Sequence, residues 1–342
     1  MSHGAFVRGA RALLSDYVSL SAGRRLLLVH DPRAGGVARA LGIVAAGAGI
    51  HVRRVSAARA WPAVRAHLVD RCDAAVFLEV DRSHHTRPLL RFLSARSPLP
   101  RVYRLFGATA ETIRGGFRCP RELLRRRNWG LIEQARRAGR MVVTSPRGTR
   151  LVVGIDRTAG WTNTYGEAAD GYPGVLPPAE VNTRSAEVDG VLVADGAIGS
   201  NIGWPLDARL GARPITLRLS GGRVVDVECR HALVRDLVEA FLRVPGCDEV
   251  VEVGIGTNDG IPRFAASDIL LNERMAGFHL GVGSADAADR RRNLHLDFIL
   301  GECRVLLGRR VAVSHGRFAE APAGRLPEPG GYEVPVKLHD AL

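Results

Sequence analysis

The sequence is poor in several features that would assign it to a specialised class of protein. Its 342 residues include only five cysteines, an odd number that is widely scattered and never spaced C-x-x-C. Such usage indicates neither a disulfide framework nor a thiolate zinc site. No apolar run reaches the roughly 18 residues that a membrane span requires, and the stretch M-S-H-G-A-F-V-R-G-A-R lacks the apolar core of a signal peptide. We therefore expect a soluble, cytoplasmic protein that does not act at a membrane.

Lysine is almost absent, since Lys337 is the one lysine among 48 basic residues and the formal net charge of +13 comes from arginine. This charge is uneven: residues 1–150 contain 28 arginines against nine acidic residues, whereas residues 151–342 contain 20 basic and 26 acidic ones. The densest cluster, R-E-L-L-R-R-R at 121–127, has apolar residues at helical spacing and no aromatic residues of the kind that stack on bases. The pattern favours a solvated helix face, or a groove for an acidic ligand, over nucleic-acid binding.

Length and periodicity predict two domains and a tail. Residues 1–150 alternate short apolar runs such as L-L-L-V and A-A-V-F-L with helical stretches, which is typical of a Rossmann-like α/β domain with a parallel sheet covered by helices. Residues 151–320 have alternating runs joined by turn signals, among them S-G-G-R and the Asp-Gly of V-L-V-A-D-G-A-I. These signals predict an α+β domain with a largely antiparallel sheet, and the candidate metal site described below lies in this domain. Residues 321–342, rich in proline and glycine, are expected to form an irregular tail.

Candidate metal ligands gather in the second half of the chain. His295 and Asp297 alternate in N-L-H-L-D-F-I-L, so on a strand both side chains point to one face, roughly 6 to 7 Å apart. Glu252 lies among valines in V-V-E-V-G-I-G-T-N, where an ionised carboxylate is costly unless a cation or hydrogen-bond donors compensate it. His279 in G-F-H-L-G-V-G and Glu180 in L-P-P-A-E-V-N-T add two further donors. Imidazoles and carboxylates are ligands of zinc, cobalt, manganese and iron, although a solvated strand face would also explain H-x-D taken alone.

These motifs, in this order, resemble the aminopeptidase T and aminopeptidase S group of metallopeptidases, which includes thermophilic leucyl aminopeptidases. The resemblance runs from about residue 145 to residue 318 and rests on P-x-x-E-V-x-T, E-x-G-I-G-T-N, G-x-H-x-G-x-G after an acidic residue, and H-x-D-F. It implies a homodimeric hydrolase that acts on the N-terminal end of a peptide through two divalent ions of zinc, cobalt or manganese. The implied metal ligands are Glu180, Glu252, Glu273, His279, His295 and Asp297.

Two dications would be balanced by the four carboxylates of this set, would lower the pKa of a shared water and would polarise the scissile carbonyl. Thr257 and Asn258, just after the E-x-G-I-G motif, are expected to hydrogen-bond the substrate backbone. Gly254, Gly256 and Gly260 are expected to permit a tight turn beside the ions. One position departs from the family pattern. Asp286 stands where the family carries a tyrosine able to donate to the developing oxyanion, which leaves the catalytic group unassigned.

Two further hypotheses stay open. The chain is alternatively a peptide-binding homologue without hydrolytic activity, for instance one that presents a precursor peptide in ribosomal natural-product biosynthesis; the absent tyrosine favours this interpretation and the intact ligand set opposes it. The other is a non-haem ring-cleaving dioxygenase of the dihydroxypyridine type, since His279, His295 and Asp297 have the composition of an Fe(II)-binding triad. Glu180 and Glu252 would then support the ligands rather than bind the metal.

Overall fold

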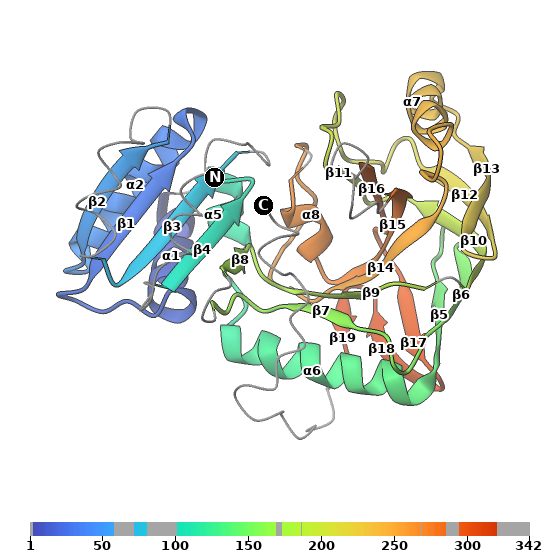
Figure 1. Ribbon diagram of the computed structural model, residues 1–342, viewed down its shortest axis with the longest axis horizontal. Coiled ribbons are helices and arrows are strands. Elements are labelled where there is room, and N and C mark those ends of the chain that lie inside the picture. The colour runs from blue at the N-terminus through green and yellow to red at the C-terminus, as the bar shows by residue number, and fades with distance from the viewer. Residues whose placement is uncertain are drawn as a thin grey trace. The chain divides into compact units, whose positions relative to one another are not determined.

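The computed structural model of the protein describes residues 3–57, 72–80, 101–168, 173–185, 187–267, 269–284 and 294–319 (Figure 1). The chain forms two compact units. The first contains the residues up to Glu122 together with Thr164–Pro178, and the second contains Leu123–Asn163 and the described residues from Ala179 onward. The helix and strand between residues 122 and 145, which we assigned to the first domain from the sequence, therefore lie mostly in the second unit.

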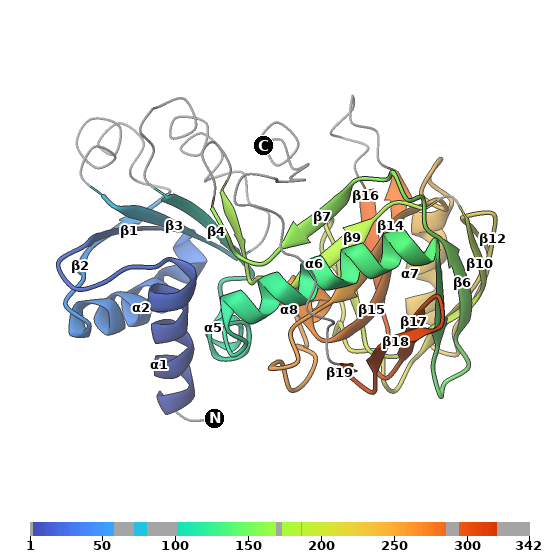
Figure 2. The same ribbon diagram turned by 90° about the horizontal axis from the view of Figure 1, so that it is seen from below.

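The first unit contains a five-stranded parallel sheet, which confirms the expected class of its fold. Its strands, in spatial order, are β2 (His51–Ser56), β1 (Arg25–His30), β3 (Ala74–Glu79), β4 (Arg101–Phe106) and β8 (Gly174–Leu176). Its described helices are α1 (His3–Ala12), the π-helical turn Leu13–Tyr17, the short 3-10 turn Pro32–Ala34, α2 (Gly35–Gly47) and α5 (Ala110–Gly115). Figure 2 shows α1, α2 and α5 on one side of the sheet. The strand β3 is buried along its whole length, as its continuous apolar run predicts.

The second unit contains two sheets, where the sequence led us to expect one. The first sheet has eight strands, all antiparallel to their neighbours. In spatial order they are β13 (Arg223–Glu228), β12 (Ile215–Ser220), β10 (Val188–Ala194), β6 (Arg150–Gly154), β5 (Arg140–Thr144), β17 (Arg304–Leu307), β18 (Arg310–Ser314) and β19 (Arg317–Phe318). Gly221 and Gly222 have positive φ angles and join β12 to β13, so the Gly-Gly signal does mark a hairpin.

The second sheet of this unit has six strands and carries the candidate ligands. In spatial order they are β11 (Ala197–Ser200), β16 (Leu294–Ile299), β15 (Gly277–Ser284), β14 (Val250–Gly256), β9 (Glu180–Thr183) and β7 (Trp161–Thr164). The Asp-Gly at 195–196 is not a hairpin turn, because it connects β10 of the eight-stranded sheet to β11 of the six-stranded one. The helices in the described part of this unit are α6 (Arg121–Ala138), α7 (Ala232–Leu242) and α8 (Leu271–Arg274).

One hydrophobic core joins both sheets of the second unit. It includes Val143 and Leu217 from the eight-stranded sheet, Phe278 and Phe298 from the six-stranded sheet, and Ile132 from α6. Because side chains alternate along a strand, the residues between these core positions point to the opposite face of the six-stranded sheet. The candidate ligands of β15 and β16 occupy such alternate positions.

From the sequence we expected no disulfide framework and no membrane-spanning segment. All five cysteines are free, as their scattered positions predict. Among the residues that the structure describes, no helix combines the length and the apolar composition needed to span a membrane.

Candidate metal centre

Five of the six predicted ligands project from the strands of the six-stranded sheet, and the sixth comes from the short helix α8. They are Glu180 in β9, Glu252 in β14, His279 in β15, His295 and Asp297 in β16, and Glu273 in α8. The strand register brings them together across large sequence separations. Gly254 is opposite His279, Gly281 is opposite Asp297 and Gly283 is opposite His295.

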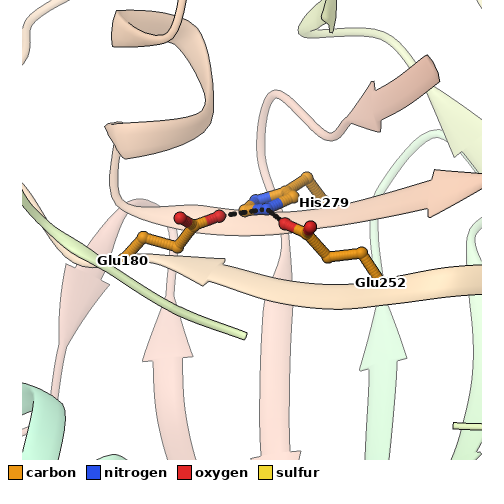
Figure 3. A group of neighbouring side chains, drawn as sticks. All are labelled: Glu180, Glu252 and His279. Atoms are coloured by element: carbon orange, nitrogen blue, oxygen red, sulfur yellow. Dashed lines mark hydrogen bonds and ion pairs between the residues drawn. The ribbon is translucent and has the colours of Figure 1, made fainter. Parts of the chain in front are cut away.

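Glu180, Glu252 and His279 form the first ligand group. Figure 3 shows the two carboxylates pointing toward the imidazole from either side. His279 Nε2 lies 2.9 Å from Glu180 Oε1 and 3.2 Å from Glu252 Oε1. One donor atom from each of the three residues lies within 4.8 Å of the others, which is close enough for all three to bind one ion.

Glu252, His295 and Asp297 form the second ligand group, which also fits within 4.8 Å. His295 Nε2 lies 2.6 Å from Asp297 Oδ1 and 3.9 Å from Glu252 Oε2. The two groups share Glu252, whose two carboxylate oxygens face different histidines. A carboxylate shared in this way is suited to bridge two adjacent cations.

Three glycines leave the space that these side chains occupy. A Cβ atom at Gly254 would overlap the His279 ring, and a Cβ at Gly281 would come within 2.5 Å of the His295 ring. A Cβ at Gly199 would lie 2.8 Å from Glu273 Oε1. These glycines form a cradle for the ligands, and this cradle, together with the imidazole and carboxylate donors, fits a site for divalent cations. Gly254 and Gly256 belong to β14, so our expectation that they form a turn was wrong, whereas Gly260 does lie in a turn.

Glu273 lies outside both groups of three, among the described residues. Its Oε1 atom and Asp297 Oδ2 both approach Gly199, so the two carboxyl groups are neighbours. The role of Glu273 as a bridging or sixth ligand stays a prediction.

Arg274 is a charged member of the cluster that the sequence did not reveal. Its side chain is 4% exposed, and its Nη1 atom forms an ion pair with Glu180 Oε2 and lies 3.9 Å from Glu273 Oε2. The four carboxylates are therefore partly neutralised by a guanidinium, so the simple balance of four carboxylates against two dications does not hold. The only signal in the sequence is that a basic residue directly follows Glu273. That position does not indicate that the arginine is buried.

Crowding of the carboxylates perturbs their acidity. Burial and the nearby Glu180 carboxylate raise the pKa of Glu252, while burial and Asp297 raise the pKa of Glu273 well above its usual value. Burial would also raise the pKa of Asp297, but His295 outweighs it and lowers that pKa to about 2. A bound cation would relieve the repulsion among these carboxylates.

In the first group, the pKa values of His279 and Glu180 shift in opposite directions. Burial would lower the pKa of His279, but hydrogen bonds to Glu180 and Glu252 raise it well above its usual value. Burial likewise opposes ionisation of Glu180, and the Arg274 guanidinium outweighs it, so the pKa of Glu180 is lowered.

Two asparagines support the ligands and were also missed. Asn182 Nδ2 donates to Glu252 Oε1 at 3.0 Å, and Asn201 Oδ1 accepts from the His295 backbone N–H at 2.9 Å. The first contact orients a ligand side chain, and the second holds the backbone of a ligand residue. Asn182 lies two residues after Glu180 on the same strand, and this spacing was the available signal.

Thr257 and Asn258, predicted to contact substrate, are both fully buried. The Thr257 hydroxyl has no hydrogen-bond partner among the described residues, and Asn258 Oδ1 accepts from the Gly260 N–H at 2.9 Å. The Asn258 N–H donates to the Arg274 carbonyl at 3.0 Å, which fastens α8 to the end of β14. The contact of Thr257 and Asn258 with substrate stays a prediction. Asp286, the residue at the position of the family tyrosine, lies outside the described residues.

No protein-family model and no curated protein sequence matches the chain. Solved structures do match it in fold. The 2,5-dihydroxypyridine dioxygenase of Pseudomonas putida KT2440 is similar with a TM-score of 0.63 and 15% identity, covering 95% of this chain and 100% of that one. Wild-type AmpT of Thermus thermophilus is similar with a TM-score of 0.56 and 17% identity, covering 92% of this chain and 99% of that one. At these identities the likeness establishes an aminopeptidase T-like fold and leaves the activity open.

Proposed function

We propose that the protein is a metal-dependent, aminopeptidase-like hydrolase that acts on the N-terminal end of a peptide through two adjacent divalent cations. The observation that carries this proposal is the pair of ligand groups that share Glu252. A carboxylate that belongs to two adjacent ligand groups suits a dinuclear site, whereas a site for a single ion has no use for the second group. The likeness in fold to AmpT is consistent with the proposal.

The ligand residues of the chain form two sets, one for each proposed ion. Glu180, Glu252 and His279 would hold one ion, and Glu252, His295 and Asp297 the other. When bound, zinc, cobalt or manganese supplies a water of lowered pKa and polarises the scissile carbonyl. Asn182 orients Glu252 through its 3.0 Å hydrogen bond.

The two proposed ions suit a peptide with a free N-terminus. Four carboxylates and the Arg274 guanidinium surround the centre, so two bound dications would leave it without excess negative charge. One ion would polarise the scissile carbonyl, and the other would hold the unprotonated N-terminal amine. We therefore expect peptides with free N-termini to be better substrates than acetylated ones.

The test compares the wild-type protein with His295→Ala and Asp297→Ala. Each variant is expected to lose metal-dependent release of the N-terminal residue by more than about 100-fold, since each removes a ligand. Far-ultraviolet circular dichroism should change little. The matched control is His315→Ala, because His315 lies in the same unit with a 69% exposed side chain. Full activity in either ligand variant would overturn the assignment.

A second candidate is the ring-cleaving dioxygenase, favoured by the fold match to the Pseudomonas putida enzyme. Its Fe(II) would be bound by His279, His295 and Asp297. Among the described residues, however, His279 groups with the two glutamates rather than with His295 and Asp297. Elemental analysis of protein purified without a histidine tag distinguishes the two: a single retained iron with cleavage of a dihydroxypyridine would favour the dioxygenase.

A peptide-binding role without hydrolysis is the remaining outcome of the same experiments. It would be indicated by binding of peptides with free N-termini, measured calorimetrically, in protein that retains no metal and releases no amino acid.

A further inference from the structure

We infer that Arg274 makes the two ligand groups unequal, so that Glu252, His295 and Asp297 hold a divalent ion tightly while Glu180, Glu252 and His279 hold a second ion only weakly. This inference rests on the proposed function, which it deepens by stating how many ions are resident at low free metal concentration.

The Arg274 guanidinium is fixed in place by its own helix. The carbonyl of Arg274 accepts a 3.0 Å hydrogen bond from the Asn258 N–H. The Asn272 side chain of the same helix accepts from the Ala265 N–H at 2.7 Å and donates to the Ala265 carbonyl. A Cβ atom at Gly256 would overlap the carbonyls of Glu273 and Met275, so the backbone of α8 and the residue after it is packed tightly against β14.

Burial prevents the guanidinium from withdrawing into solvent. With a side chain that is 4% exposed, Arg274 must keep carboxylate partners, because a buried pair that loses one member leaves an uncompensated buried charge. Glu180 is the nearer of its two carboxylate partners, and Glu273 is the other. A fixed positive charge therefore lies at hydrogen-bond distance from a ligand oxygen of the first group.

The two ligand groups consequently differ in the net negative charge that surrounds a bound dication. With neutral imidazoles, each group contains two carboxylates, one of them the shared Glu252. Arg274 offsets one of the two charges in the first group through its ion pair with Glu180. The partners of Arg274 are Glu180 and Glu273. Neither of them belongs to the second group, so the charge of Asp297 is not offset in this way.

Repulsion between a guanidinium and a dication a few ångströms apart is large in a buried site. Coulomb's law at an intermediate dielectric predicts that the second ion binds more weakly than the first by more than about 100-fold. The site would then hold one ion at low free metal concentration and two at high concentration.

The experiment titrates metal-free protein with zinc or manganese alone by isothermal calorimetry, with elemental analysis after gel filtration. We expect one tightly held ion per chain in the wild-type protein and a second ion with at least about 100-fold weaker affinity. Arg274→Met, which keeps the length of the side chain and removes its charge, should tighten the second ion by at least about tenfold. Arg274→Lys is the matched control, because it keeps the charge and should keep the inequality.

A second pair of variants covers the case in which Arg274→Met does not fold. Glu180→Gln alters only the first group and should leave the tight ion in place, whereas Asp297→Asn alters only the second and should lose it. Two ions of equal affinity in the wild-type protein, loss of the tight ion in Glu180→Gln, or unchanged affinities in folded Arg274→Met would overturn this inference alone. Failure of the wild-type protein to bind any ion would overturn the proposed function as well.

Discussion

Buried ionisable side chains of the second unit differ in whether a neighbouring charge compensates their burial. Asp297 is compensated by His295, so its pKa falls to about 2 despite burial. The thiol of Cys303 lacks such compensation. Burial raises its pKa to about 12, and the nearby carboxylates of Asp195 and Glu302 act in the same direction. The same degree of burial thus gives an ionised group at one position and a neutral group at another.

At this scale we predict that Cys303 resists alkylation in the folded protein. A pKa raised from 9 to about 12 leaves roughly one thiol in 10⁴ as thiolate at pH 8, and the thiolate is the reactive form. The rate with iodoacetamide should rise about tenfold per pH unit between pH 8 and pH 10 and stay far below that of unfolded protein. Mass spectrometry of the peptide that contains Cys303 measures both rates. Equal rates in folded and unfolded protein at pH 8 would contradict the prediction.

Glycines in the strands of the six-stranded sheet leave the space that the ligand side chains occupy. Gly254 and Gly281 lie on β14 and β15 beneath the rings of His279 and His295. Neither has a positive φ angle, so their role is to leave space rather than to allow an unusual backbone conformation. An alanine at either position would be compatible with the strand and incompatible with the ligand above it.

We therefore predict that Gly281→Ala weakens metal binding in a protein that still folds. The new methyl group would come within 2.5 Å of the His295 ring and within 2.8 Å of Glu252 Cβ, forcing both ligands to move. Metal affinity should fall by more than about tenfold, with a loss of roughly 1 to 3 kcal/mol in the free energy of unfolding. Calorimetric metal titration and urea denaturation measure the two effects.

The matched control is Gly160→Ala. A Cβ at Gly160 meets no atom within 4 Å, and the residue lies just before β7 of the same sheet. This variant should bind metal with wild-type affinity. Equal losses of metal affinity in the two variants would remove the proposed role of Gly281.

The molecule as a whole contains two compact units with separate buried ion pairs. In the first unit, Arg104 binds Glu79 through Nε at 2.8 Å and through Nη2 at 2.9 Å, and the Glu79 side chain is completely buried. In the second unit, Arg274 pairs with Glu180 inside the candidate metal centre. A buried pair of this kind is costly to break because the remaining charge loses its partner.

We predict that Glu79→Ala destabilises the first unit by roughly 3 to 5 kcal/mol and leaves the metal content of the protein unchanged. Hydrogen exchange of the β3 and β4 amides would report the loss of stability, and elemental analysis the metal. Arg24→Ala is the control: its partner Asp73 is a surface carboxylate and the Arg24 side chain is 62% exposed, so the cost should stay below about 1 kcal/mol. Loss of metal in Glu79→Ala, or no loss of stability, would contradict this prediction.

Local sequence was sufficient for the classes of the sheets and for the shared strand face of two candidate ligands. Apolar runs separated by helical stretches indicated the parallel sheet, and alternating runs with Gly-Gly indicated the antiparallel hairpin of β12 and β13. His295 and Asp297 were readable because a period of two places them on one strand face. These features depend on residues that are near one another in the chain.

The tertiary structure alone decided the division of the second unit into two sheets, the space that Gly199, Gly254 and Gly281 leave for the ligands, and the position of Arg274 beside Glu180. Each depends on strands and helices that are distant in the chain and meet only through register and packing. Glu180 and Arg274 are separated by 94 positions, so no local pattern relates them. The sequence by itself determined which metal-ligand side chains the chain contains. The fold determined which of them interact with Arg274, because electrostatic interactions depend on distance in space rather than along the chain.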